Sequence, residues 1–254
     1  MASSAIEITG VTKVYPGDNP VTALENIDLE IADGEFAALL GPSGCGKSTL
    51  LNLLAGFETV TAGNLHVYGE AVTAPGPQRA VVFQEAALFP WLNVWENVVF
   101  GPKVQGMPAQ QYEQKASETL KLVGLENFAK HLPVQLSGGM RQRVGIARVL
   151  VMEPTLLLMD EPFGALDAQT RLTMQQLLLD VWEGLKKTVV FVTHDIDEAI
   201  LLADVIYVMS ARPGRIATRI PVEVPRPRNL DTLTDVHFNE MKKRIMHEMR
   251  VDQH

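Results

Sequence analysis

The stretch that most restricts the fold of this chain is "GPSGCGKST" at residues 41–49. The apolar run "EFAALL" at 35–40 precedes it, and "KSTLLNLLA" follows with a helical pattern that ends at Gly56. A strand, a glycine-rich turn and a helix, in this order, are the context in which G-x-x-x-x-G-K-[ST] binds phosphate. We therefore predict a polyphosphate site at this turn. An ordinary glycine-rich turn is the alternative.

Within this loop, Gly41 and Gly46 let the backbone turn so that successive N–H groups point at a β-phosphate. Lys47 is expected to bridge β- and γ-phosphate oxygens, and Ser48 to bind Mg²⁺. The dipole of the helix contributes only roughly 0.3–1 kcal/mol, at most about 2 kcal/mol, so the lysine and the metal are needed to hold a polyphosphate. The other loop residues that we expect at the nucleotide are Pro42, Ser43, Gly44, Cys45 and Thr49.

Two later apolar runs end in polar residues. "LLLMDEP" places Asp160 and Glu161 at the end of a buried strand, where carboxylates are unfavourable unless they meet a cation or transfer a proton. We assign Asp160 to Mg²⁺ and Glu161 to polarising the attacking water. An acidic strand end that caps a helix is the alternative.

"VVFVTHD" places His194 at the end of a second strand. We expect His194 at the γ-phosphate, because ligands of open α/β sheets bind at the carboxyl ends of the strands. A structural histidine is the alternative.

The remaining pattern predicts an α/β fold with a P-loop NTPase core. Short β-rich runs broken by turn residues in the first 70 residues indicate an antiparallel β subdomain. Several later runs are apolar on both faces, which favours a mostly parallel sheet. These runs, together with the one before the loop, are 35–40, 79–83, 155–160, 188–193 and 205–209.

Two amphipathic helices are also expected. One begins at Pro108, with a buried stripe of Tyr112, Ala116, Leu120 and Val123. The other buries Leu172, Leu177 or Leu178, Val181 and Leu185. We predict an ATPase domain over 1–221, with a helical subdomain inserted at about 86–150, and a short helical tail at 222–254.

Composition excludes several classes of function. The net charge of −8 provides no broad basic surface, so we expect no nucleic-acid partner. The single cysteine, Cys45, excludes an internal disulfide and a thiolate-cluster metal site. No stretch has the roughly 18 or more uncharged apolar residues of a transmembrane helix, so any role at a membrane requires a partner.

A second glycine-containing segment, "LSGGMRQRVGIAR" at 136–148, also has the pattern of an anion site. A helix that opens after Ser137 would direct its free N–H groups, near Gly138 and Gly139, at a negative group. A separate helical subdomain is poorly placed to reach the phosphate loop of its own chain. A second copy of the chain, arranged head to tail, could supply this segment to the nucleotide of its partner.

The ordered set "GPSGCGKST", "VVFQ", "LSGGMRQR", "LLLMDEP", "GALD" and "VTHD" resembles the nucleotide-binding subunit of ATP-binding-cassette (ABC) transporters over residues 5 to about 215. The resemblance implies an ATPase that binds two ATP molecules, with Mg²⁺, between two copies. It implies that Tyr15 stacks on adenine, Gln84 binds Mg²⁺ and senses the partner, and Asp167 crosses the dimer interface. The alternatives are that Tyr15 packs in the core, that Gln84 is a solvated loop residue and that Asp167 is a helix N-cap.

This chain departs from the family pattern at two positions. Met140 replaces the usual glutamine of the signature, and Gly164 replaces the usual serine before "ALD". Met140 removes one polar contact at the lid of the nucleotide, but Ser137 and the glycines carry the anion site. We therefore expect activity to be retained.

Similarity of "FPWLNVWENV" and "SARPGRI" indicates the importer branch that handles nitrate, sulfonates and taurine. It implies an integral membrane permease as partner, a periplasmic or extracellular substrate-binding protein that acts through the permease, and a peripheral location on the cytoplasmic face of the inner membrane. The aromatic stretch 85–101 then forms a groove for a permease helix or, alternatively, packs in the core.

Four other functions are alternatives to an importer subunit. A DNA-repair ATPase would need a long coiled-coil insertion, but only about ninety residues separate Lys47 from Ser137. A translation factor would carry two cassettes, and a P-loop kinase has no use for "LSGG". A non-transport ABC ATPase that serves as an assembly or scaffold subunit is the remaining alternative.

Overall fold

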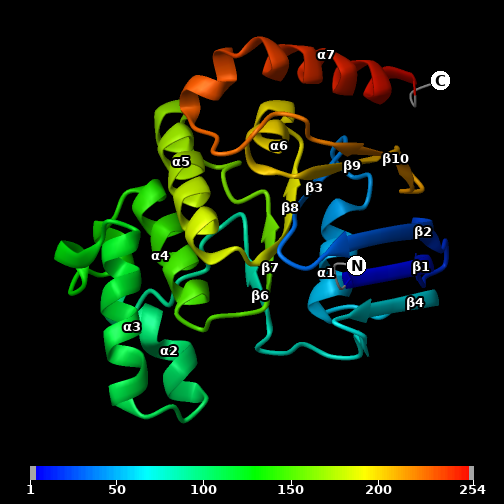
Figure 1. The fold of residues 1–254 in the computed structure, drawn as a ribbon. Coiled ribbons are helices and arrows are strands. Elements are labelled where there is room, and N and C mark those ends of the chain that lie inside the picture. Colours follow the sequence, from blue (N-terminus) through cyan, green and yellow to red (C-terminus); the bar gives the residue numbers. More distant parts are fainter. Residues whose placement is uncertain (1–3, 252–254) are drawn as a thin grey trace.

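The computed structural model describes residues 4–251, without the side chains of Leu185, Arg250 and Val251. Its strands form two sheets (Figure 1). The antiparallel sheet consists, in spatial order, of β2 (Val21–Ala32), β1 (Ser4–Tyr15), β4 (Ala62–Val67) and β5 (Glu70–Ala71). The second sheet consists, in spatial order, of β10 (Ile216–Pro221), β9 (Val205–Met209), β3 (Phe36–Leu40), β8 (Thr188–Thr193), β7 (Leu156–Asp160) and β6 (Arg79–Val82). It is parallel except for β10, which confirms the predicted α/β class.

The helices surround the second sheet and extend to one side of it (Figure 1). They are α1 (Lys47–Ala55), α2 (Val94–Val104), α3 (Ala109–Leu122), α4 (Gly138–Leu150), α5 (Ala168–Leu185), α6 (Ile196–Leu202) and α7 (Val236–Val251). Short 3₁₀ helices cover Glu126–Phe128, Pro133–Gln135 and Leu230–Thr234. Within residues 4–251, no helix has the length and apolar character needed to cross a membrane.

Strand β3 lies between β8 and β9, and all five of its residues are buried. Because side chains alternate along a strand, Phe36, Ala38 and Leu40 join the apolar cluster formed with α5, α6 and α7. Ala37 and Leu39 join a second cluster, formed with α1 and the antiparallel sheet. The central sheet is therefore covered on both faces, as the apolar runs predicted.

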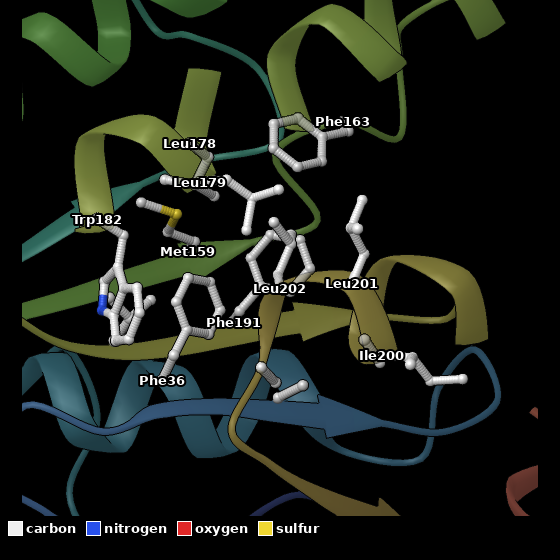
Figure 2. Close-up of a cluster of buried hydrophobic side chains, with 14 of the residues drawn as sticks. Phe36, Met159, Phe163, Leu178, Leu179, Trp182, Phe191, Ile200, Leu201 and Leu202 are labelled. Atoms are coloured by element: carbon white, nitrogen blue, oxygen red, sulfur yellow. The ribbon is translucent and has the colours of Figure 1, made fainter. Parts of the chain in front are cut away.

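Aromatic side chains hold β3 and β8 against helix α5 (Figure 2). The rings of Phe36 and Phe191 have centroids 5.9 Å apart, and Phe36 meets Trp182 edge to face at 5.8 Å. Such pairs contribute about 0.5–1.5 kcal/mol beyond the area they bury. This packing fixes the relative position of two strands whose carboxyl ends carry the predicted site residues.

Helices α2, α3 and α4 surround an apolar cluster of their own. Helix α3 follows Pro108 and buries the stripe predicted for it, Tyr112, Ala116, Leu120 and Val123. Asn93 and Glu96 form a capping box that starts α2. The buried Asn97 amide donates to the carbonyl oxygens of Leu92 and Asn93, at 2.9 and 3.0 Å, and so ties the preceding loop to the helix.

The stripe predicted for α5 is partly wrong. Leu172 is 40% exposed, and the buried face instead carries Met174, Leu178, Val181 and Trp182. Positions 172 and 174 differ by two residues, or about 200° around a helix, so they face opposite sides. Leu177 is partly buried. The side chain of Leu185, which completed the predicted stripe, lies outside the described residues.

The segment between β10 and α7 is fastened to the end of α6 by a buried arginine. Arg228 is 4% exposed and donates to the carbonyl oxygens of Ile200 and Ala203, at 3.0 and 2.6 Å, and to that of Val224 at 2.7 Å. It thus satisfies carbonyl groups that a helix end leaves free. Burial lowers the pKa of the Arg228 guanidinium to about 10. The described part of the tail is therefore packed onto the core of the domain.

We expect Arg228→Ala to lower the free energy of unfolding by about 3 kcal/mol, because several buried carbonyl groups lose a charged donor. For a chain of this size, the melting temperature should fall by roughly 6–12 °C. Arg244→Ala is the matched control, because its contact with Glu223, at 3.5 Å, is largely exposed and contributes at most about 1 kcal/mol. Equal melting temperatures for the two variants would contradict this role of Arg228.

Candidate nucleotide site

The loop between β3 and α1 wraps around the side chain of Lys47. This residue is 4% exposed, and its Nζ donates to the carbonyl oxygens of Gly41 and Pro42, at 2.8 and 3.0 Å. The Nζ atom also lies 3.9 Å from Glu161 Oε1. A buried ammonium with mostly neutral acceptors is poorly compensated, so this position suits an incoming anion.

The loop glycines are required by backbone angles and by close contacts. Gly44 and Gly46 have φ of +76° and +103°, values that favour glycine. An added Cβ at Gly46 would lie 2.6 Å from Leu24 Cδ2, and one at Gly41 would lie 2.8 Å from the carbonyl oxygen of Met209. The loop is therefore packed between strands β2 and β9, and larger residues at these positions would displace it.

The predicted acidic residues and the histidine meet at the end of β7 and β8. Ser48 Oγ donates to Asp160 Oδ1 at 3.0 Å. His194 Nδ1 lies 3.1 Å from Glu161 Oε2, and because a carboxylate only accepts, Nδ1–H is the donor. Asp167 caps α5, so neither of the two strand-end carboxylates fills that role. The structure thus brings Lys47, Ser48, Asp160, Glu161 and His194 together.

The donor set fits a magnesium ion that is shared with a nucleotide. Burial raises the pKa of Asp160, while the hydrogen bond from Ser48 opposes that shift. Among residues 4–251, no cluster of three or more His, Cys, Asp or Glu side chains could hold a metal. Mg²⁺ usually takes one or two protein groups together with phosphates and water. The hydroxyl of Ser48 beside the carboxylate of Asp160 offers this kind of partial site.

Gln84 follows β6 and lies across Gly164 from Glu161. A Cβ added at Gly164 would come within 3.0 Å of Gln84 Nε2 and within 3.7 Å of Glu161 Oε2. The glycine at this position therefore gives the glutamine amide space beside the carboxylate. This is the structural consequence of one of the two departures noted in the sequence.

A cavity of about 370 Å³ opens over the loop. Tyr15 lines this cavity and is partly exposed, so it is not a core residue. The Lys13 ammonium lies 4.9 Å from the centre of the Tyr15 ring.

Arg212, from the turn after β9, lines the cavity of about 370 Å³ as well. The segment "SARPGRI" contains Arg212 but did not indicate a role at the loop, because Arg212 meets the loop only through the pairing of β9 with β3. A larger cavity, of about 760 Å³, lies between β1, β2 and β10 and contains no residue of the loop.

The segment 137–140 does not line the cavity of about 370 Å³ over the loop. Ser137 caps α4, and its Oγ accepts from the Met140 N–H at 3.3 Å. An added Cβ at Gly139 would lie 2.3 Å from Thr170 Cγ2, whereas the nearest atom at Gly138 is 3.9 Å away. Gly139 is thus needed where α4 packs on α5, while the surroundings of Gly138 are open.

Asp167 forms the N-cap that we gave as the alternative interpretation. Its Oδ1 accepts from the Thr170 N–H at 3.0 Å, and hydrogen bonds from Thr170 hold the pKa of this exposed carboxyl below its ordinary value. Asp167, like the segment 137–140, does not line the nucleotide cavity of its own chain.

Comparison with known proteins gives consistent results. The family model described as "ABC transporter" matches residues 24–164. The nitrate import ATP-binding protein NrtD of Synechocystis sp. is 48% identical over 221 residues, which cover 87% of this chain and 83% of that protein. The taurine import ATP-binding protein TauB of Burkholderia pseudomallei is 52% identical over 206 residues, covering 81% and 79%.

A solved structure is also similar to this fold. It is a dimeric ATP-binding cassette, MJ0796, in a post-hydrolysis state with ADP and phosphate. Its TM-score is 0.74 at 34% sequence identity, and the match covers 86% of this chain and 99% of the solved one.

Proposed function

This chain belongs to the ABC transporter family and is an ATPase, and on this basis we propose that it drives import of a small anion, such as nitrate, taurine or another sulfonate, through a membrane permease. The position of Glu161, between Lys47 and His194 and beside a phosphate loop, is the observation that supports ATP hydrolysis as the source of energy. The names of the nitrate and taurine import relatives support the direction of transport and the class of cargo.

We assign hydrolysis to the residues gathered around the loop. Ser48, Asp160 and Gln84 would hold a Mg²⁺ ion, which would partly neutralise the charge on the γ-phosphate of bound ATP. Lys47 exchanges its two carbonyl acceptors for phosphate oxygens. Glu161 orients a water and accepts its proton.

His194 has to change its hydrogen bonding to contact the γ-phosphate. A neutral imidazole that donates from Nδ1 has an unprotonated Nε2, which cannot donate to phosphate. Contact with phosphate therefore requires either a second proton or loss of the 3.1 Å bond to Glu161. Loss of that bond would leave the Glu161 carboxylate free for the attacking water.

The complete site, in this proposal, forms between two copies arranged head to tail. The nucleotide held by the loop of one copy is covered by Ser137, Gly138, Gly139 and Met140 of the other copy. Asp167 lies at the interface between the two copies. Two observations support this arrangement: the segment 137–140 does not line the cavity of its own chain, and the similar solved cassette is dimeric. Closure on ATP and reopening after hydrolysis then shift the permease between two states.

Helices α2–α4 are proposed as the inserted subdomain at about 86–150 that contacts the permease. Its core-facing residues Val94 and Val98 are buried, but Trp91 is 72% exposed. The Phe89 ring lies 5.7 Å from that of Trp91 and 4.4 Å from that of Phe100. An exposed aromatic cluster above a packed helix suits an apolar partner helix.

This contact would hold the domain of residues 1–221 at the cytoplasmic face of the inner membrane as a peripheral subunit. We place the end of that domain at residue 221, with residues 222–254 as a tail. The substrate-binding protein would act only through the permease.

We expect Glu161→Gln to reduce ATP turnover by about 10²–10⁴-fold, because the general base is lost. The variant should accumulate as an ATP-bound dimer, which size-exclusion chromatography with ATP and a phosphate-release assay would detect. Glu153→Gln is the matched control, because Glu153 pairs with Lys115 on the surface. Turnover of Glu161→Gln at the parental rate would contradict the assignment.

We expect Trp91→Ala to lose copurification with an integral membrane permease from detergent-solubilised membranes. Its ATPase activity should be retained, and its stability should change by no more than about 0.5 kcal/mol, because the ring is mostly exposed. Val236→Ala, a truncation of an exposed apolar residue on α7, is the control. Undiminished recovery of the permease with Trp91→Ala would exclude this surface. If the parental chain recovers no permease, the scaffold function replaces the importer.

A further inference from the structure

The turn 211–215, between β9 and β10, is docked on the outside of the phosphate loop. The Gly214 N–H donates to the Ala23 carbonyl at 3.0 Å, and the Glu25 N–H donates to the Gly214 carbonyl at 2.9 Å. An added Cβ at Gly214 would lie 2.0 Å from the Cys45 carbonyl oxygen. The turn is therefore held between β2 and the loop, and its position is fixed by backbone contacts.

These contacts place the guanidinium of Arg212 against the loop. Its Nε donates to the Gly44 carbonyl at 2.9 Å. A Cβ added at Gly44 would lie 2.9 Å from Arg212 Nη2, so only glycine allows this approach. The same side chain lines the cavity of about 370 Å³ together with Tyr15 and Lys47.

The charge of Arg212 has no acidic partner in the described part of the chain. The next three arginines along the chain, Arg215, Arg219 and Arg226, each pair with a carboxylate. Arg212 forms a single hydrogen bond through Nε among the described residues, which leaves the N–H groups of both Nη atoms available. An uncompensated, exposed guanidinium at the wall of a cavity favours a negatively charged ligand.

We propose that Arg212 is a second cationic ligand of the nucleotide polyphosphate, in addition to Lys47. This inference rests on the proposed nucleotide site and adds a binding residue to it. A guanidinium donates two parallel hydrogen bonds to phosphate oxygens, a geometry that an ammonium cannot reproduce. The fixed turn holds the group next to the loop before the nucleotide arrives, which limits the ordering required on binding.

The test is the affinity for ATP and for GTP, measured by isothermal titration calorimetry with Mg²⁺ and the non-hydrolysable β,γ-imido analogue of each nucleotide to prevent turnover. Arg212→Gln keeps an N–H donor for the Gly44 carbonyl but removes the charge. We expect it to bind both nucleotides about tenfold more weakly, corresponding to the loss of one exposed charged contact. Arg212→Lys should restore part of the affinity. The affinity of Arg212→Gln should also depend less on salt, because one screened interaction is gone.

Two controls separate the possible failures. Arg215→Gln makes the same substitution in the same turn, at an arginine paired with Glu25, and should change ATP affinity less than twofold. Lys47→Ala should abolish binding. Retained binding by Lys47→Ala would overturn the nucleotide site itself, and this inference with it.

Three other results would overturn only the role of Arg212. The first is unchanged affinity in Arg212→Gln. The second is a loss limited to one of the two nucleotides, which would indicate a contact with the base. The third is an equal loss in Arg215→Gln, which would indicate that Arg212 only supports the turn.

Discussion

The buried ammonium of Lys47 is the constraint on which the rest of the site depends. Its nearest acceptors are two loop carbonyls, and the closest carboxylate oxygen, from Glu161, is 3.9 Å away. The loop holds it there because Gly46 has a conformation and surroundings that exclude a side chain. Strands β3, β7 and β8 are paired in parallel, so their carboxyl ends bring the loop, Glu161 and His194 to one place. A bound polyphosphate would compensate the lysine charge at this place.

The same architecture separates the two segments that we predict to bind anions. Helix α1 packs on one face of the central sheet, with the antiparallel strands, whereas the end of α4 packs with α5 and α6 on the other. The N-terminus of α4, capped by Ser137, therefore does not reach the cavity over Lys47. We propose a second copy as the source of the segment that covers the nucleotide, and the open surroundings of Gly138 leave room for a ligand there.

Local patterns predicted the parts of the fold that local chemistry determines. The sequence predicted the loop, helix α1 with a glycine at its end, the buried strands, and the strand-end residues Asp160 and His194. The buried face of α5 was assigned in part to the wrong residues, because Leu172 follows the apolar period but lies opposite Met174. The segment "SARPGRI" contains Arg212 but did not indicate its contact with the loop, and Arg228 was missed, because these contacts join segments far apart in the chain. Such contacts depend on how the whole chain folds, which a short motif does not encode.

The most direct measurement is a complementation assay between two inactive variants. Lys47→Ala loses the loop cation, and Gly138→Asp adds a carboxylate where the structure has space and where an acidic first turn does not disturb the helix. Mixed dimers would contain one intact site, so the mixture should recover up to about a quarter of the parental ATPase rate by random pairing. A mixture no more active than the two separate variants would contradict the account that each nucleotide site is built from two copies.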